Sequence, residues 1–246
     1  MRLLRVTYAP YAFLCFFILM LFVVAACPFF LLFGKIRGGN LVYKACWCWA
    51  KVWCFLIGIR YEEKDESLSK KEAHYIYIAN HQSYMDIPQA ILCMHNRQVR
   101  ILGKAEMVKY PLFGLIYRMA VIVVDRSSPE KRAHSVRALK AALDKDISIF
   151  IFPEGTFNET GKPLKDFYDG AFRIAIETQT PIKPVIFVDT VKRLHYNSIL
   201  SLTPGVSRSV FLEEIPVAAY TMKDIQRLKQ DAFLAMENAL LKYARI

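Results

Sequence analysis

Apolar and polar positions divide this chain into two parts. Residues 11–33 are apolar throughout, and a second apolar segment covers 41–59 after the basic, glycine-rich residues 34–39. A helix of about 20 apolar residues is long enough to span a bilayer. Beyond residue 71 the apolar runs are shorter and alternate with amphipathic segments. The pattern predicts an N-terminal membrane anchor of two helices, residues 1–60, followed by a globular domain, residues 61–246.

The anchor has two possible arrangements. Basic residues flank the first segment on both sides, so the positive-inside rule does not select a simple span. In the second segment Lys44 and Lys51 share one helical face, and three tryptophans suit the membrane interface. A hairpin that enters and leaves on the cytoplasmic face fits both features. A transmembrane helix followed by an interfacial one is the alternative.

The remaining sequence alternates between strand-like and helix-like segments. Short β-branched or aromatic runs predict strands at 75–79, 99–102, 121–124, 147–152, 182–188 and 209–213. Amphipathic segments predict helices at 86–95, 111–119, 129–143, 170–179 and 222–243. The charged residues 61–71 are interpreted as a connection. This order predicts an α/β fold, a mostly parallel sheet flanked by helices.

Charge and cysteine content narrow the class of protein. The first 61 residues contain no acid and contribute +7 of the formal net charge of +11. Because these cations flank apolar runs, they indicate anionic lipid headgroups and no nucleic acid partner. The six cysteines show no zinc spacing, so we expect neither a disulfide framework nor a metal. This usage favours a reducing compartment.

The segment 80–86, Asn-His-Gln-Ser-Tyr-Met-Asp, follows the first strand of the expected sheet. A carboxylate bonded to one imidazole nitrogen makes the other a better base. On one helix, residues five apart point about 140° away from each other, so His81 and Asp86 can pair only across a turn. Asp86 would then cap the next helix. The alternative is a turn histidine beside a capping aspartate, without catalysis.

Further polar residues follow the other expected strands. Ligands of open α/β sheets bind outside the carboxyl ends of the strands. The resulting candidates for substrate binding are Lys104, Arg126, Glu154, Gly155 and Thr156. The following loop, 157–169, is long enough to cover a substrate. Taken singly, each charged residue is more often a solvated cap.

Four blocks in this order resemble the glycerolipid acyltransferase superfamily, and within it the bacterial 1-acyl-sn-glycerol-3-phosphate acyltransferases. Residues 80–86 resemble the NHxxxxD motif, 103–126 the second block, 152–156 the FPEGT block and 181–185 the fourth. Two positions depart from the family pattern. Phe157 stands where arginine is frequent, and Asp169 stands where lysine is common. Lys104, Arg126, Lys162 or Lys165 would have to supply the charge that binds a phosphate.

The resemblance implies a reaction. His81, oriented by Asp86, would deprotonate the sn-2 hydroxyl of lysophosphatidic acid, which attacks an acyl-CoA or an acyl-carrier protein thioester and yields phosphatidic acid. No cofactor is implied. No GxSxG elbow surrounds Ser83, so a serine nucleophile is not expected. The expected place of this step of phospholipid synthesis is the cytoplasmic face of the inner membrane.

Three alternatives stay open at this point. In the first, the protein is an acyltransferase whose acceptor is another lysolipid or glycerol 3-phosphate. A metal-dependent phosphoesterase would use His81, Asp86 and Glu154 as ligands, although this is a sparse set. A membrane-bound lipid-binding protein without catalysis would use the same fold.

Overall fold

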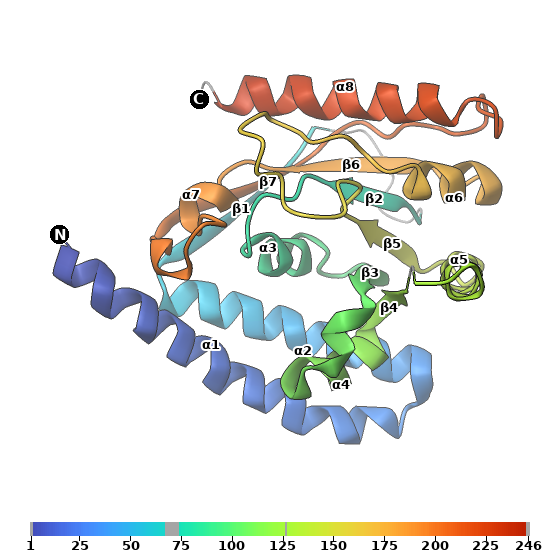
Figure 1. Cartoon of the computed structure of the whole chain (residues 1–246). Coiled ribbons are helices and arrows are strands. Elements are labelled where there is room, and N and C mark those ends of the chain that lie inside the picture. Colours follow the sequence, from blue (N-terminus) through green and yellow to red (C-terminus); the bar gives the residue numbers. More distant parts are fainter. Residues whose placement is uncertain (1, 67–73, 126, 245–246) are drawn as a thin grey trace.

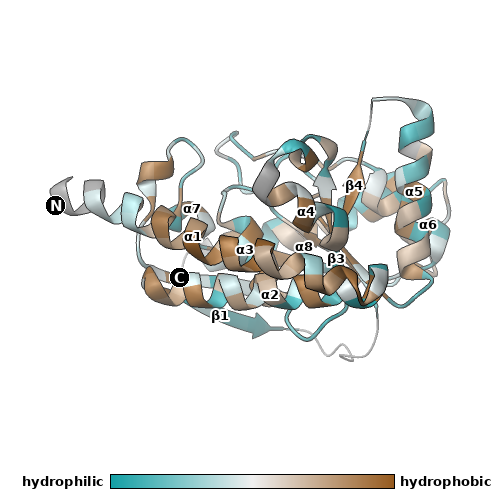
Figure 2. Ribbon diagram, turned by 90° about the horizontal axis from the view of Figure 1, so that it is seen from below, coloured by the Kyte–Doolittle hydropathy of each residue, from teal (hydrophilic) through white to brown (hydrophobic). Residues whose placement is uncertain are grey.

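The computed structural model describes residues 2–66, 74–125 and 127–244, and its first two helices lie antiparallel below the sheet (Figure 1). These helices are α1 (Arg2–Leu31) and α2 (Gly34–Leu56). The turn between them ends at Gly34, which has a φ of 75°, a left-handed conformation that glycine adopts without strain. By length and composition, Thr7–Leu31 within α1 is able to cross a membrane. Figure 2 shows that apolar residues cover the underside of α1.

The sheet has seven strands in the order β1-β7-β6-β2-β5-β3-β4. They are β1 (Ile59–Asp65), β2 (Ile76–Ala79), β3 (Val99–Lys104), β4 (Val121–Val124), β5 (Ser148–Ile151), β6 (Ile182–Phe187) and β7 (Gly205–Phe211). Within the described chain, β6 and β7 pair antiparallel and the other neighbours pair parallel. The predicted α/β fold with a mostly parallel sheet is confirmed.

Helices cover both faces of this sheet (Figure 1). They are α3 (Asp86–Cys93), α4 (Pro111–Ala120), α5 (Pro129–Leu143), α6 (Gly170–Thr178), the short α7 (Thr190–Arg193) and α8 (Ile225–Ala244), with 3-10 turns η1 (Ala105–Lys109) and η2 (Ile199–Ser201). In β2, Tyr77 and Ala79 join the core beneath the sheet, whereas Ile76 and Ile78 join the core under α6 and α8. Burial on both faces explains why the central strands are continuously apolar.

Three sequence-based expectations are wrong in detail. Residues 61–65, expected in a connection, complete β1, which pairs with β7 at the edge of the sheet. Charged side chains are tolerated there because an edge strand faces solvent. Residues 67–71 lie outside the described chain. The last strand begins at Gly205 instead of 209. The last helix begins at Ile225 instead of 222, because Asp224 accepts hydrogen bonds from Thr221 and closes a turn before the helix starts.

The tryptophans of α2 also differ from expectation. Trp49 and Trp53 were predicted at the lipid interface, but both are buried between α1 and α2. Their indole N–H groups donate to the carbonyl oxygens of Phe16 and Ala12. These two bonds cross-link α1 and α2. The opposite face of α1 exposes Leu21 and other large apolar side chains. The division into domains at residue 60 stays a prediction.

Candidate active site

The turn after β2 is held by Asn80. Its buried side chain accepts from the backbone N–H of Phe187 and donates to the carbonyl oxygen of the same residue. These two bonds fasten the end of β2 to the end of β6. The next residue, His81, is therefore fixed at the carboxyl edge of the parallel strands, where ligands of such sheets bind.

His81 and Asp86 meet across this turn, as predicted. The Nδ1 atom of His81 lies 2.8 Å from Oδ2 of Asp86. The same oxygen accepts the backbone N–H groups of Gln82, at 2.6 Å, and Ser83, at 2.7 Å. Asp86 is the first residue of α3, with Met85 as the cap, so it is not the N-cap that we expected. A carboxylate at this helix end is stabilised by the helix dipole.

Two aromatic rings hold the imidazole of His81. Its ring stacks on Phe152 at a centroid distance of 4.2 Å, and the edge of Phe157 approaches at 4.5 Å. The residue that replaces the family's arginine thus forms part of the site wall. Because Nδ1 is bonded to Asp86, Nε2 is the nitrogen available to a substrate. The His81 side chain is 16% exposed, enough for contact with a ligand in the adjoining cavity.

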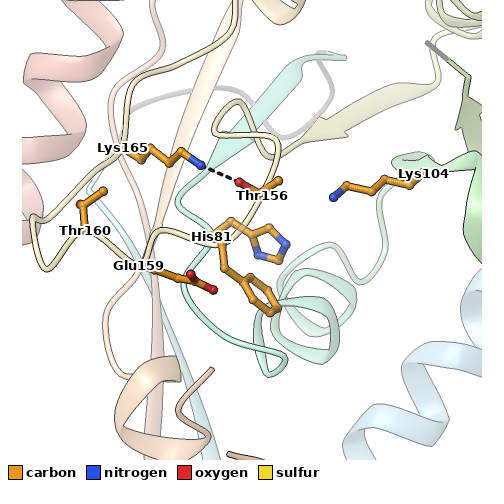
Figure 3. A pocket seen from close by; sticks show the side chains of 7 residues that line it. His81, Lys104, Thr156, Glu159, Thr160 and Lys165 are labelled. Carbon is orange, nitrogen blue, oxygen red and sulfur yellow. Dashed lines mark hydrogen bonds between the residues drawn. The ribbon is translucent and has the colours of Figure 1, made fainter. Parts of the chain in front are cut away.

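A cavity of about 470 Å³ opens beside His81. It is lined by His81, Lys104, Thr156, Phe157, Glu159, Thr160 and Lys165. Figure 3 shows Lys104 pointing from the end of β3 toward His81, and Lys165 donating to Thr156 from the loop that covers the other side. Lys104 and Lys165 thus share one cavity with His81, which together with Asp86 is called the dyad below. Sequence reasoning missed Glu159 and Thr160 as lining residues, and their place in the long loop 157–169 was the available signal.

Glu154 lies beneath the cavity instead of lining it. It is fully buried, and its Oε1 and Oε2 atoms accept the backbone N–H groups of His81 and Lys165. Burial raises the pKa of Glu154 to about 7. Gly155 follows with a φ of 70°, a conformation that favours glycine. Glu154 therefore joins the turn that carries His81 to the loop 157–169. Direct contact of Glu154 or Gly155 with substrate stays a prediction.

The structure does not bring every predicted cation to the cavity. Arg126 lies outside the described residues. Lys162 is not among the residues that line the cavity. Asp169, which stands in place of a family lysine, pairs with Lys229 at 2.8 Å and ties the start of α6 to α8.

Ser83 is not available as a nucleophile. It is fully buried, its hydroxyl donates to the carbonyl oxygen of Leu194, and it accepts the N–H of Met85. The side chain closes the turn that carries His81. This geometry agrees with the absence of a nucleophile elbow in the sequence.

An apolar cavity of about 370 Å³ lies among α1, α2, α3 and α4. Tyr84 and Ile87, which flank Asp86 in sequence, form part of its wall, together with Phe16, Trp53 and Ile116. The cavity therefore begins beside the turn that carries His81, and the N-terminal helices form part of its wall. Sequence reasoning did not find it, because its walls come from several elements that are far apart in the sequence.

Comparison with known proteins decides the family. The family model described as Acyltransferase matches residues 59–188, more than half of the chain. This chain belongs to the Acyltransferase family. The sequence-based assignment to acyltransferases is confirmed, and the matched residues start with β1 and end just after β6.

Two curated relatives of this acyltransferase-family chain are named 1-acyl-sn-glycerol-3-phosphate acyltransferase. The relative from Cocos nucifera is 32% identical over 169 residues, 68% of this chain and 53% of the relative. The relative from Haemophilus influenzae is 30% identical over 175 residues, 70% of this chain and 71% of the relative. The chain thus spans about half of the plant relative and more of the bacterial one.

A solved structure shares the whole fold. The crystal structure of the 1-acyl-sn-glycerophosphate (LPA) acyltransferase PlsC from Thermotoga maritima matches with a TM-score of 0.73 and 20% identity, over 97% of each chain. The similarity includes the region of α1 and α2, because only 3% of this acyltransferase-family chain is left uncovered. At this identity the match establishes the fold alone.

Proposed function

We propose that this protein transfers an acyl chain from a thioester to the sn-2 hydroxyl of lysophosphatidic acid and forms phosphatidic acid. The observation that carries the proposal is the His81–Asp86 pair, 2.8 Å apart, at a cavity that also holds Lys104 and Lys165. The names of the relatives from Cocos nucifera and Haemophilus influenzae support the choice of acceptor.

The chemistry follows from the free nitrogen of His81. Nε2 takes the proton of the acceptor hydroxyl while its oxygen attacks the thioester carbonyl carbon. A C–O bond forms and the C–S bond breaks, and the proton then passes from His81 to the departing thiolate sulfur. Asp86 stabilises the imidazolium during this transfer. Because a thiolate leaves readily, no enzyme nucleophile is needed, in keeping with the buried Ser83.

Substrate positions follow from the charge and polarity of the two cavities. Lys104 and Lys165 offer ammonium groups to the acceptor phosphate, a charge-assisted contact that would place the hydroxyl near His81. Arg126 and Thr156 remain candidates for the same role. The apolar cavity beside Tyr84 and Ile87 suits an acyl chain. The acyl donor is an acyl-CoA or an acyl-carrier protein, and no resident cofactor is required.

The acceptor lipid places the reaction at a membrane. Helix α1 lines the apolar cavity with Phe16 and Met20, and it exposes Leu21 and Phe22 to its surroundings. We therefore place the protein on the cytoplasmic face of the inner membrane, held by α1 and α2 as a hairpin. An acceptor in the leaflet would then enter without crossing water.

The test is an assay of purified full-length protein with radiolabelled acyl-CoA or acyl-carrier protein. Lysophosphatidic acid, glycerol 3-phosphate and other lysolipids serve as parallel acceptors. Labelled phosphatidic acid from lysophosphatidic acid is the expected product. A faster reaction with another acceptor would replace the proposed substrate, and binding of both substrates without ester formation would favour a lipid-binding role.

A metal-dependent phosphoesterase is the rival from another enzyme class. Among residues 2–66, 74–125 and 127–244, no three His, Cys, Asp or Glu side chains are grouped to hold a metal ion. Phosphate release that stops with EDTA and returns with a divalent ion would favour this rival. Acyl transfer that is unchanged by EDTA would support the proposal.

A further inference from the structure

A second polar cavity lies at the far end of α3 from Asp86. It measures about 230 Å³ and lies between α2 and the segment that joins α3 to β3. It is lined by Asn40, Tyr43, Lys44, Trp47, His95, Asn96, Arg97, Gln98, Val99 and Arg100. Because α3 has eight residues, about 12 Å of helix separate this cavity from the catalytic carboxylate. It is a site separate from that of the proposed reaction.

The cavity is positively charged. Lys44, Arg97 and Arg100 line it, and no aspartate or glutamate does. In the described part of the chain, none of these three cations lies within 4.0 Å of a carboxylate oxygen. The guanidinium of Arg97 lies 4.5 Å from the ring centroid of Phe211 and donates to the carbonyl oxygen of Cys93, so Lys44 and Arg100 are the cations that we assign to a ligand. Two cations without a carboxylate partner attract an anion.

Arg100 is the buried cation of this cavity. It is only 7% exposed, and its guanidinium donates to the carbonyl oxygens of Val99 and Ile36. Burial lowers the pKa of Arg100, yet a guanidinium remains charged in proteins. A Cβ atom on Gly39 would lie 2.5 Å from the carbonyl oxygen of Met119 and 2.7 Å from Nη2 of Arg100, so α2 requires glycine where it packs against the end of α4 beside the guanidinium. A buried charge without a counter-ion is costly, and a bound anion would offset that cost.

The cavity also offers a hydrogen-bond acceptor. The Oδ1 atom of Asn40 is buried and has no hydrogen-bond partner in the described structure. Across the cavity, the rings of Trp47 and His95 stack at 5.7 Å and form a wall. A fitting ligand therefore combines an anionic group, for the cations, with a hydrogen-bond donor, for Asn40.

The position of α2 indicates where this ligand comes from. Lys44 is exposed on the same helix as Val52 and Phe55, which expose large apolar surface, and α2 packs along α1. We propose that this cavity binds the phosphate of a membrane phospholipid whose headgroup also carries a hydrogen-bond donor. Phosphatidylglycerol has this chemistry, because its phosphodiester is anionic and its terminal glycerol carries hydroxyl groups. The site would hold the helix pair and the sheet in one orientation on the leaflet.

Native mass spectrometry of the full-length protein in detergent tests this proposal. The probes are phosphatidylglycerol, phosphatidylcholine, which has no headgroup donor, and inorganic phosphate. The wild-type protein should retain phosphatidylglycerol in preference to phosphatidylcholine. Lys44→Gln should weaken phosphatidylglycerol binding about 10-fold, the loss of one charge-assisted contact. Lys35→Gln, on an exposed residue of the same helix, is the matched control and should bind like wild type.

Further variants separate the alternatives. Arg100→Gln should lose the lipid as well, and Lys44→Gln keeps the test valid if that variant does not fold. Lys104→Ala should leave binding unchanged, and a loss there would place the lipid in the His81 cavity and overturn the proposal. Equal retention of both lipids, or equal binding by Lys44→Gln and Lys35→Gln, would overturn it too. Binding of inorganic phosphate but not of lipid would identify a soluble anion as the ligand and reject the lipid.

Discussion

At the scale of single residues, one carboxylate oxygen of Asp86 organises the site. Oδ2 of Asp86 accepts from the His81 ring and from two backbone N–H groups, so the carboxylate holds both the turn and the tautomer of His81. Glu154 bonds the backbone of the same histidine from below. His81 is thus held through its ring and through its main chain, which preorganises Nε2 toward the cavity.

Lys104 allows a test of phosphate binding. Lys104→Ala should raise the KM for lysophosphatidic acid about 10-fold, because one charge-assisted contact is lost, and should change the KM for the acyl donor far less. Lys109→Ala, five residues further along and outside the cavity, is the matched control. Steady-state kinetics with each substrate varied in turn measure both constants. Equal rises in the two KM values would exclude a specific phosphate contact.

The raised pKa of Glu154 predicts a pH dependence of stability. Because the pKa is about 7 in the folded protein and 4.5 ordinarily, the folded state keeps a proton that the unfolded state releases. This contribution is complete below pH 4.5 and is lost as the pH rises to about 7, by at most ~1.4 kcal/mol per pH unit. Glu154→Gln should remove this fall in the free energy of unfolding. Melting temperatures of both proteins at pH 4.5, 5.5 and 7 provide the comparison, and parallel curves would contradict the assignment.

At the scale of elements, α3 links the turn that carries His81 to the sheet through buried hydrogen bonds. The side chain of Gln89 donates to the hydroxyl of Ser209 and accepts from that of Ser207, and all three residues are buried. Gln89→Ala should therefore destabilise the protein by ~1–3 kcal/mol for each hydroxyl left unpaired. Denaturant unfolding in detergent measures the change, with the exposed Gln226→Ala as control. A loss no larger than that of the control would show that water replaces the bonds.

The N-terminal helices make a prediction about membrane attachment. Apolar burial of α1 contributes far more than its flanking cations, so 1 M salt should leave the protein in the membrane fraction. Detergent should release it. Release by salt alone would show a peripheral, electrostatic attachment instead.

The hairpin has its own test. An engineered Arg37→Cys, just after the turn between α1 and α2, should resist a membrane-impermeant maleimide added outside intact cells. The native exposed Cys48 is replaced by serine in this variant, and labelling of Cys48 in the unmodified protein serves as the reference on α2. Labelling of residue 37 from outside would favour a full span by α1.

Element by element, the sequence predicts what depends on local pattern. The β2 strand, α5 with its Ser128 cap and Pro129, and the turn at His81 follow from periodicity and capping residues. The edge strand β1 was missed because its charged residues carry no apolar alternation, and its pairing with β7 joins segments far apart in sequence. The burial of Trp49 and Trp53 was also missed, because it depends on how α1 packs on α2, a contact between separate segments.

At the scale of the whole molecule, α1 and α2 cover one side of the sheet (Figure 1), and the apolar cavity lies among these two helices, α3 and α4. The residues of the dyad could be read from the sequence, since they follow one strand. The apolar cavity could not, because α1, α2, α3 and α4 meet only in the folded protein. The joining role of Glu154 also depends on contact between two distant loops.

The central claim is that His81 acts as the base of an acyl transfer. Its most direct test is the rate of phosphatidic acid formation by purified His81→Ala protein with lysophosphatidic acid and an acyl thioester, beside wild type and His134→Ala, an exposed histidine of α5. We predict a loss of ~10²–10⁴-fold in kcat for His81→Ala, the usual contribution of a general base, with unchanged membrane binding and melting temperature, and a wild-type rate for His134→Ala. A His81→Ala rate within a few-fold of wild type would contradict the account.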